Sequence, residues 1–249
     1  MEIERQQQPA LNIVLPGEQI DLSQLSGQLL IDEKSFTQTT DNQLYSNKSG
    51  VLVDTQLKDG ACGLIVKAYA QKYYAEVDDY VIGVIKGRVQ EYYIVDIGAQ
   101  EDALLSFYGF EGATKKNRPN LRDGSLIFCK VIEANKYMKI KVDCIHPKIK
   151  KQWMTGESFF GQIKDGMVAN ISIEYAKNII GQGDFVFRAF KKYIKSFETA
   201  IGSNGKVWIK TLQPQNTILI LNALNKCENM SMEQIKVYVD QLSPLLVKE

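Results

Sequence analysis

The feature that most constrains the fold is a series of five short apolar runs between residues 80 and 145. Each run is five to eight residues long and rich in β-branched or aromatic side chains, which favours strands over helices. A longer basic loop precedes the fourth run. This pattern is typical of a five-stranded OB-type barrel, here in a domain of residues 78–147. The expected strands are residues 80–85, 92–97, 103–107, 126–132 and 138–145.

The segment ahead of this barrel has a similar but shorter pattern. Turn residues such as Pro16-Gly17 and Lys48-Ser49-Gly50 separate its apolar runs at short intervals. We therefore predict a small N-terminal β domain over residues 1–77. Its expected strands include residues 13–15, 29–31, 50–53 and 63–66.

The pattern changes after His146-Pro147, where strands and helices begin to alternate. A capping box, Ser231 with Gln234, predicts the start of the last helix. The order strand, helix, helix, strand, strand, helix is that of a eukaryotic-type (type I) KH domain, expected over residues 148–249. The fold class is therefore multi-domain, mostly β and then α+β. The expected elements are strands 167–173, 196–201 and 206–210, and helices 174–180, 184–193, 215–227 and one from 231.

Charge is distributed unevenly along a nearly neutral chain. The 249 residues carry 30 Lys and Arg and 29 Asp and Glu, a net charge of +1. Residues 1–77 have a net charge of −4, residues 78–147 of 0 and residues 148–249 of +5. The total excludes a strongly basic protein, so any contact with nucleic acid depends on local groups of cations.

Several functional classes are excluded by missing motifs. The first ten residues do not resemble a secretory signal, and no apolar run is long enough to span a membrane. Four cysteines without CxxC spacing and one histidine, His146, do not make an ordinary zinc module. No common hydrolase, nucleotide-binding or two-metal nuclease motif occurs. We expect no enzyme activity, no metal and no cofactor.

Four segments carry a resemblance to a known family. The barrel region resembles an S1 domain, and an S1 domain between an N-terminal β unit and a KH domain is similar to the cap subunits of the eukaryotic RNA exosome. Within that family the chain resembles the Rrp-forty type, also called exosome component three. The segments are VIGVI at 81–85, IVDIG at 94–98, FEGATKKNRPN at 110–120 and GSNGKVWI at 202–209.

The resemblance implies a non-catalytic subunit of a hetero-oligomer rather than a homo-oligomer. Such subunits sit on a ring of phosphorolytic-nuclease-type subunits, stabilise it, and help guide single-stranded RNA into a pore for 3′ to 5′ degradation. The complex works in nucleus, nucleolus and cytoplasm. The alternative is a free-standing S1/KH protein that binds single-stranded RNA on its own.

Candidate RNA-binding residues lie in and beside the barrel. OB-type domains bind single strands with aromatic side chains on which bases stack and with cations that follow the backbone. The aromatic residues could equally fill the barrel core or an interface, and the cations could belong to a solvated loop. The aromatic candidates are Tyr92, Tyr93, Phe107 and Tyr108, and the cationic ones are Lys115, Lys116, Arg118 and Arg122.

The KH region contains a glycine motif away from the usual RNA-binding loop. A KH domain grips RNA with a GxxG loop between its first two helices, but here that position, Gly181-Gln182-Gly183-Asp184, ends in an acid. The motif at 202–205 lies between two strands, where Asn-Gly favours a hairpin turn. The resemblance implies that this hairpin braces S1 against KH. Its structural residues are Gly202, Asn204, Gly205 and Trp208.

Overall fold

The computed structural model divides the chain into two compact units, Met1–Tyr69 and Ala70–Glu249. The N-terminal eleven residues and two residues of the loop between the first KH helices, Gly183 and Asp184, lie outside the described residues. The structure describes residues 12–21, 29–31, 35–39, 41, 43–56, 62–67, 72–135, 137–182, 185–194, 196–228 and 230–246.

The first unit consists of two small sheets around an apolar core, so the prediction of an N-terminal β domain is confirmed. One sheet has the order β1-β6-β7-β3 and the other the order β2-β5-β4. Val14, Ile20, Phe36, Leu44 and Leu64 are buried between them. The strands are β1 (Ile13–Val14), β2 (Gln19–Ile20), β3 (Leu29–Ile31), β4 (Phe36–Gln38), β5 (Leu44–Ser46), β6 (Gly50–Gln56) and β7 (Cys62–Lys67).

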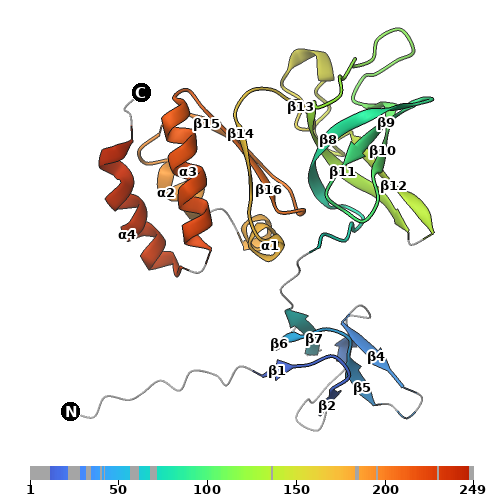
Figure 1. Cartoon of the computed structure of the whole chain (residues 1–249), viewed down its shortest axis with the longest axis vertical. Helices are drawn as coiled ribbons and strands as arrows, with labels where there is room; N and C mark the ends of the chain where they lie inside the picture. The colour runs from blue at the N-terminus through green and yellow to red at the C-terminus, as the bar shows by residue number, and fades with distance from the viewer. Residues whose placement is uncertain are drawn as a thin grey trace. The chain divides into compact units, whose positions relative to one another are not determined.

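The predicted five-stranded barrel is confirmed in the second unit (Figure 1). Its strands follow the order β12-β10-β9-β8-β11, and an additional pairing of β12 with β11 closes the sheet. Buried and half-buried positions alternate along most of β10, which is the pattern of a strand with one face in a core. The strands are β8 (Tyr80–Val89), β9 (Tyr92–Asp96), β10 (Ala103–Phe110), β11 (Leu126–Asn135) and β12 (Met138–Cys144).

A further strand, β13 (Gly161–Ile163), extends the barrel sheet. It lies beyond residue 147, where the sequence predicts the end of the barrel domain, and pairs with Leu126, Ile127 and Phe128 of β11. The connecting segment contains a short 3-10 helix, η1 (Trp153–Thr155). Residues 148–163 therefore pack on the barrel before the chain enters the KH region.

The KH region has the predicted order of elements, and its three strands form an antiparallel sheet in the order β14-β16-β15. The capping box at Ser231 is confirmed. The first strand ends earlier than predicted, because Ile173 already begins α1. The elements are β14 (Met167–Asn170), α1 (Ile173–Gln182), α2 (Phe185–Phe190), β15 (Phe197–Ile201), β16 (Lys206–Thr211), α3 (Pro214–Cys227), α4 (Met232–Leu242) and η2 (Ser243–Leu245).

The KH region has its own core, formed where α2, α3 and α4 pack together and α3 packs against β14 and β16. Phe187, Phe190, Ile209, Ile220 and Leu224 are among its fully buried members. Among the described residues, no helix has the length and apolar character needed to cross a membrane.

Candidate nucleic-acid interface

The loop between β10 and β11 is held against the barrel by the hydroxyl group of Tyr93. This hydroxyl donates a hydrogen bond of 2.5 Å to the carbonyl oxygen of Pro119 and accepts one of 3.4 Å from the backbone N–H of Leu121. The Leu121 side chain is buried in the barrel core. A small turn between Thr114 and Asn117 stiffens the outer part of the loop with reciprocal backbone hydrogen bonds. The loop is therefore attached at a defined position.

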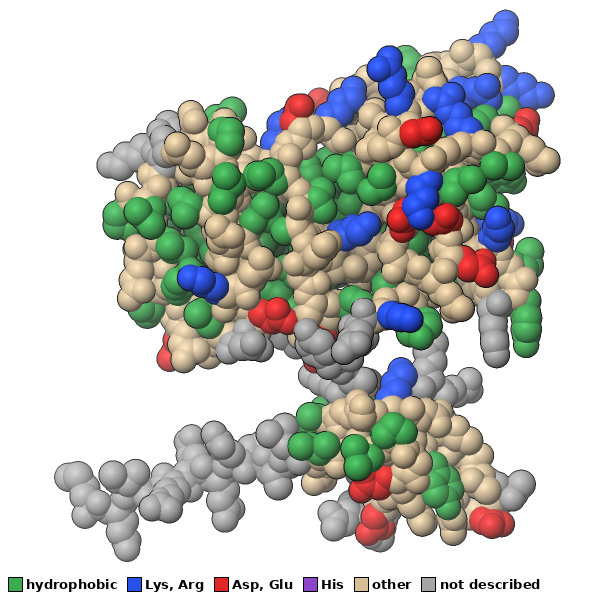
Figure 2. All heavy atoms as spheres, in the orientation of Figure 1, with side chains coloured by type: hydrophobic (Ala, Val, Ile, Leu, Met, Phe, Trp, Pro, Cys, Tyr) green, Lys and Arg blue, Asp and Glu red, His purple; other side chains and the backbone are tan. Residues whose placement is uncertain are grey.

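The four predicted cations of this loop are exposed. Lys115, Lys116 and Arg122 form no ion pair with any described residue, whereas the guanidinium of Arg118 lies 4.6 Å from the centre of the Phe107 ring. Figure 2 shows Lys and Arg side chains gathered over the barrel edge that carries the loop, at the upper right of the view. Cations that are not held in ion pairs create a local positive potential that attracts phosphate.

The four predicted aromatic residues occupy two different environments. Tyr93 and Phe107 are buried, and their ring centres lie 4.5 Å apart in an edge-to-face contact. Tyr92, next to Tyr93 in β9, and Tyr108, next to Phe107 in β10, are half-buried. The structure therefore brings Tyr93 and Phe107 together beneath the basic loop, where one anchors the backbone and the other supports Arg118.

Arg88 is a further residue of this site that sequence reasoning missed. Its guanidinium donates a 2.7 Å hydrogen bond to the side chain of Asn120 and another to the carbonyl oxygen of Leu121. It also lies 5.5 Å from the centre of the Tyr93 ring. A lone arginine at a strand end gives no local signal of this role, because its partners are 32 and 33 residues away.

The segment between β12 and β13 runs beside the basic loop. The backbone N–H of Trp153 donates a 3.2 Å hydrogen bond to the carbonyl oxygen of Glu111, and the Asn117 amide contacts the Met154 sulfur at 2.9 Å. The segment carries the exposed Lys148 and Lys150. The cations of the basic loop and those of the segment after β12 are separate in the sequence, but they thus belong to adjoining segments.

His146 has a structural position in this segment. Its Nδ1 atom accepts hydrogen bonds from the backbone N–H groups of Lys148, at 3.1 Å, and Ile149, at 3.0 Å. Its ring packs against Phe159 and Phe160, with ring centres 5.0 and 5.6 Å apart. The histidine therefore organises the turn that follows β12.

The hairpin at 202–205 inserts into the barrel. The Asn204 amide donates hydrogen bonds to the carbonyl oxygens of Ile82, at 2.8 Å, and Ile97, at 2.7 Å, and its oxygen accepts one from the Ile82 N–H at 3.4 Å. The backbone N–H of Ser203 donates to the Tyr80 carbonyl oxygen at 2.7 Å. Asn204 is 9% exposed, so these bonds are shielded from water.

The glycines of the hairpin are required by close contacts. Gly205 has φ +76°, and a Cβ atom there would lie 2.6 Å from the carbonyl oxygen of Ile171. A Cβ atom on Gly202 would lie 2.2 Å from the Asn204 side-chain oxygen. Trp208 packs in the barrel core and donates a 2.7 Å hydrogen bond to the Asp165 carbonyl oxygen. Together these contacts connect the KH sheet to the barrel.

A charged cluster holds the neighbouring loop between β9 and β10. The ammonium group of Lys86 lies 3.0 Å from Asp96 and 2.9 Å from Asp102, at the two ends of that loop. A hydrogen bond from the Gly98 N–H, followed by the Lys86 charge, lowers the pKa of the Asp96 carboxyl group. The cluster therefore supports the loop whose Ile97 carbonyl oxygen binds Asn204.

Two family models match the second unit. Residues 73–156 match the S1 domain of the exosome complex component RRP40, and residues 166–215 match a KH domain.

Curated relatives cover most of the chain. "Exosome complex component rrp40" of Schizosaccharomyces pombe is 32% identical over 242 residues, which are 94% of this chain and 96% of the relative. "Exosome complex component RRP40" of Mus musculus is 32% identical over 196 residues, 78% of this chain and 69% of the relative.

One solved crystal structure, of a protein provisionally described as an exosome complex RNA-binding protein, has a similar fold. It aligns with a TM-score of 0.55 at 17% identity and covers 70% of this chain and 99% of its own.

Proposed function

Because the chain belongs to the RRP40 family of exosome complex components, we propose that it is a non-catalytic, RNA-binding cap subunit of the RNA exosome. In this role it stabilises the ring of the complex. It also helps to guide single-stranded RNA into the pore for 3′ to 5′ processing and degradation.

The observation that carries the RNA part of this proposal is the anchored basic loop. Its exposed cations project from a backbone that Tyr93 and Arg88 attach to the barrel. Pre-ordered cations contact phosphates without the entropic cost of ordering a loop, so a few of them suffice for a guiding contact. We assign RNA contact to Lys115, Lys116, Arg118 and Arg122, with Tyr92 and Tyr108 beside them and Tyr93 and Phe107 beneath.

The KH hairpin supports the structural part of the proposal. Asn204 and Trp208 bond and pack between the KH sheet and the barrel, while Gly202 and Gly205 allow the close approach. We assign these four residues to bracing S1 against KH rather than to gripping RNA. The division into residues 1–77, 78–147 and 148–249 remains our proposal for the domains.

We further propose that the partners are ring subunits of the phosphorolytic-nuclease type, in a hetero-oligomer that acts in nucleus, nucleolus and cytoplasm. Affinity purification of the tagged full chain from its own cells tests this assembly. We expect the ring subunits to be recovered in amounts nearly equal to that of the tagged chain. The fraction of the chain in each cell compartment measures its localisation. Recovery of the chain alone, with RNA but without ring subunits, would instead support the free-standing RNA-binding protein.

A further inference from the structure

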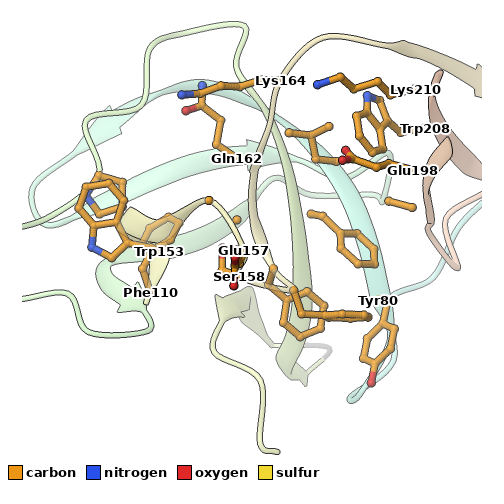
Figure 3. Close-up of a pocket in the computed structure, with 18 of the residues that line it drawn as sticks. Tyr80, Phe110, Trp153, Glu157, Ser158, Gln162, Lys164, Glu198, Trp208 and Lys210 are labelled. Carbon is orange, nitrogen blue, oxygen red and sulfur yellow. The ribbon is translucent and has the colours of Figure 1, made fainter. Parts of the chain in front are cut away.

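A groove of about 950 Å³ lies between the barrel and the KH strands of the second unit. Figure 3 shows Trp153 and Phe110 on one side and Trp208, Glu198 and Lys210 on the other. Ligand pockets commonly measure about 300–1,000 Å³. The groove is therefore large enough for a nucleotide.

The groove contains an aromatic ring that is held in place yet accessible. Phe159 lines the groove and is 46% exposed. Its ring centre lies 4.9 Å from that of Phe160, 5.8 Å from that of Phe128 and 5.0 Å from that of His146. A ring fixed by several neighbours loses little freedom when a base stacks on it, which favours stacking.

Lys164 is a cation of the groove that no described acid neutralises. Glu157 is paired with Lys151 at 2.8 Å, and the ammonium group of Lys210 is paired with Asp165 at 3.3 Å. Glu198 forms no ion pair with a described residue, although it lies opposite Lys210 in the register of β15 and β16. Lys164 is exposed and forms no ion pair with a described residue. The groove therefore has one acid and one lysine without an ion pair among the described residues, and Lys164 is the cation that an anionic group can contact.

The groove is continuous with the basic loop. Pro119 and Asn120, at the end of that loop, line the groove. Trp153, which also lines it, is bonded through its backbone to Glu111 of the same loop, and its indole N–H is buried without an acceptor among the described residues. A donor in this state gains most from a ligand acceptor that reaches it. A strand bound along the loop would therefore pass directly into the groove.

From these observations we infer that the groove between S1 and KH is a second RNA subsite, which binds a nucleotide of single-stranded RNA next to the basic loop. The base stacks on Phe159 and the phosphate contacts Lys164. This inference rests on the proposed RNA-binding function and adds to it a position on the chain.

Photo-crosslinking of the full chain to single-stranded oligouridylate that contains thiouridine tests the subsite. We expect crosslinked peptides from residues 153–159 in addition to peptides from the basic loop. Lys164→Ala should lower the groove crosslinks several-fold, leave the loop crosslinks unchanged, and reduce the salt dependence of RNA affinity by about 0.7 in log–log slope. Lys236→Ala, on an exposed position of α4, serves as the matched control and should change neither.

A second variant tests stacking. Phe159→Ala should weaken RNA binding about fivefold, and its melting temperature shows whether the protein remains folded. Crosslinks confined to the loop, or groove crosslinks that Lys164→Ala does not lower, would overturn the subsite while leaving the proposed function intact. Crosslinks nowhere on the chain would contradict both. A crosslinking map of the assembled complex that places a protein segment in the groove would also overturn the proposed RNA subsite.

Discussion

Asn204 shows how one side chain connects two domains. Its amide satisfies backbone groups of Ile82 and Ile97, which are 122 and 107 residues away in the chain. These backbone groups would otherwise be buried without partners, and each such group costs about 1–3 kcal/mol. The free energy of unfolding of the second unit should therefore depend on this residue.

Asn204→Ala tests this dependence. We expect the free energy of unfolding to fall by about 1–3 kcal/mol in urea denaturation, because the carbonyl oxygens of Ile82 and Ile97 lose their donor. Asn225→Ala, at an exposed position of α3, is the matched control and should change it by less than about 0.5 kcal/mol. Equal effects of the two substitutions would show that Asn204 does not join the domains.

The lowered pKa of Asp96 predicts that the stability of the second unit depends on pH. The Gly98 N–H and the Lys86 ammonium group lower its pKa below the ordinary value of 3.8. The stabilisation is therefore present above pH 3.8 and is lost as the pH falls through the lower folded-state pKa. Thermal unfolding from pH 6 downwards should show a smaller loss of stability for Asp96→Asn than for the wild type. Parallel curves for the two proteins would contradict the assignment.

At the scale of elements, the basic loop depends on the strand beneath it. Tyr93→Phe keeps the ring and removes the hydroxyl that bonds Pro119 and Leu121. We expect RNA affinity to fall about two- to fivefold, because part of the loop must then be ordered on binding. Fluorescence anisotropy with single-stranded RNA measures this. Tyr74→Phe, at a residue that is 67% exposed, is the control, and an equal loss in both would refute the anchoring role.

The hairpin between β15 and β16 depends on backbone geometry. Gly205→Ala places a Cβ atom against the Ile171 carbonyl oxygen at a positive φ angle, so we expect a loss of about 1–3 kcal/mol in unfolding free energy. Gly87→Ala is the control, since a Cβ atom there meets nothing within 4 Å. Folded Gly205→Ala protein should bind RNA as the wild type does. A selective RNA defect at unchanged stability would instead assign the hairpin to RNA.

The elements that the sequence predicts well are those with a clear local pattern. Short apolar runs rich in β-branched or aromatic residues marked the five barrel strands, and the Ser231 capping box marked the start of α4. The strand β13 was not predicted, because three residues carry no periodicity and its pairing with β11 is a long-range contact. Arg88 was missed for the same reason. Its role depends on partners in a distant loop rather than on its neighbours in the sequence.

The aromatic residues show a second limit of sequence reasoning. Tyr92 and Tyr93 are adjacent and equally plausible as stacking residues, but only the closed barrel decides that Tyr93 points into the core and Tyr92 is half-buried. The groove between S1 and KH was likewise invisible in the sequence, because its two sides come from residues about 40 positions apart, such as Phe159 and Thr199.

For the whole molecule, near-neutral charge is compatible with a narrow RNA contact. The net charge of +1 combines a segment of −4 with one of +5, and the neutral barrel carries four of its ten cations in one exposed loop. Such a chain attracts RNA weakly over most of its surface and more strongly along one strip. This suits a subunit that guides RNA within an assembly.

The salt dependence of RNA binding by the full chain tests this account most directly. Replacing Lys115, Lys116 and Arg118 by Ala should weaken binding of single-stranded RNA and reduce the slope of log affinity against log salt by about 2, at an unchanged melting temperature. Replacing the exposed Lys177, Lys226 and Lys236 of the KH helices by Ala is the matched control. An unchanged slope in the loop variant, or an equal reduction in the control, would contradict the account.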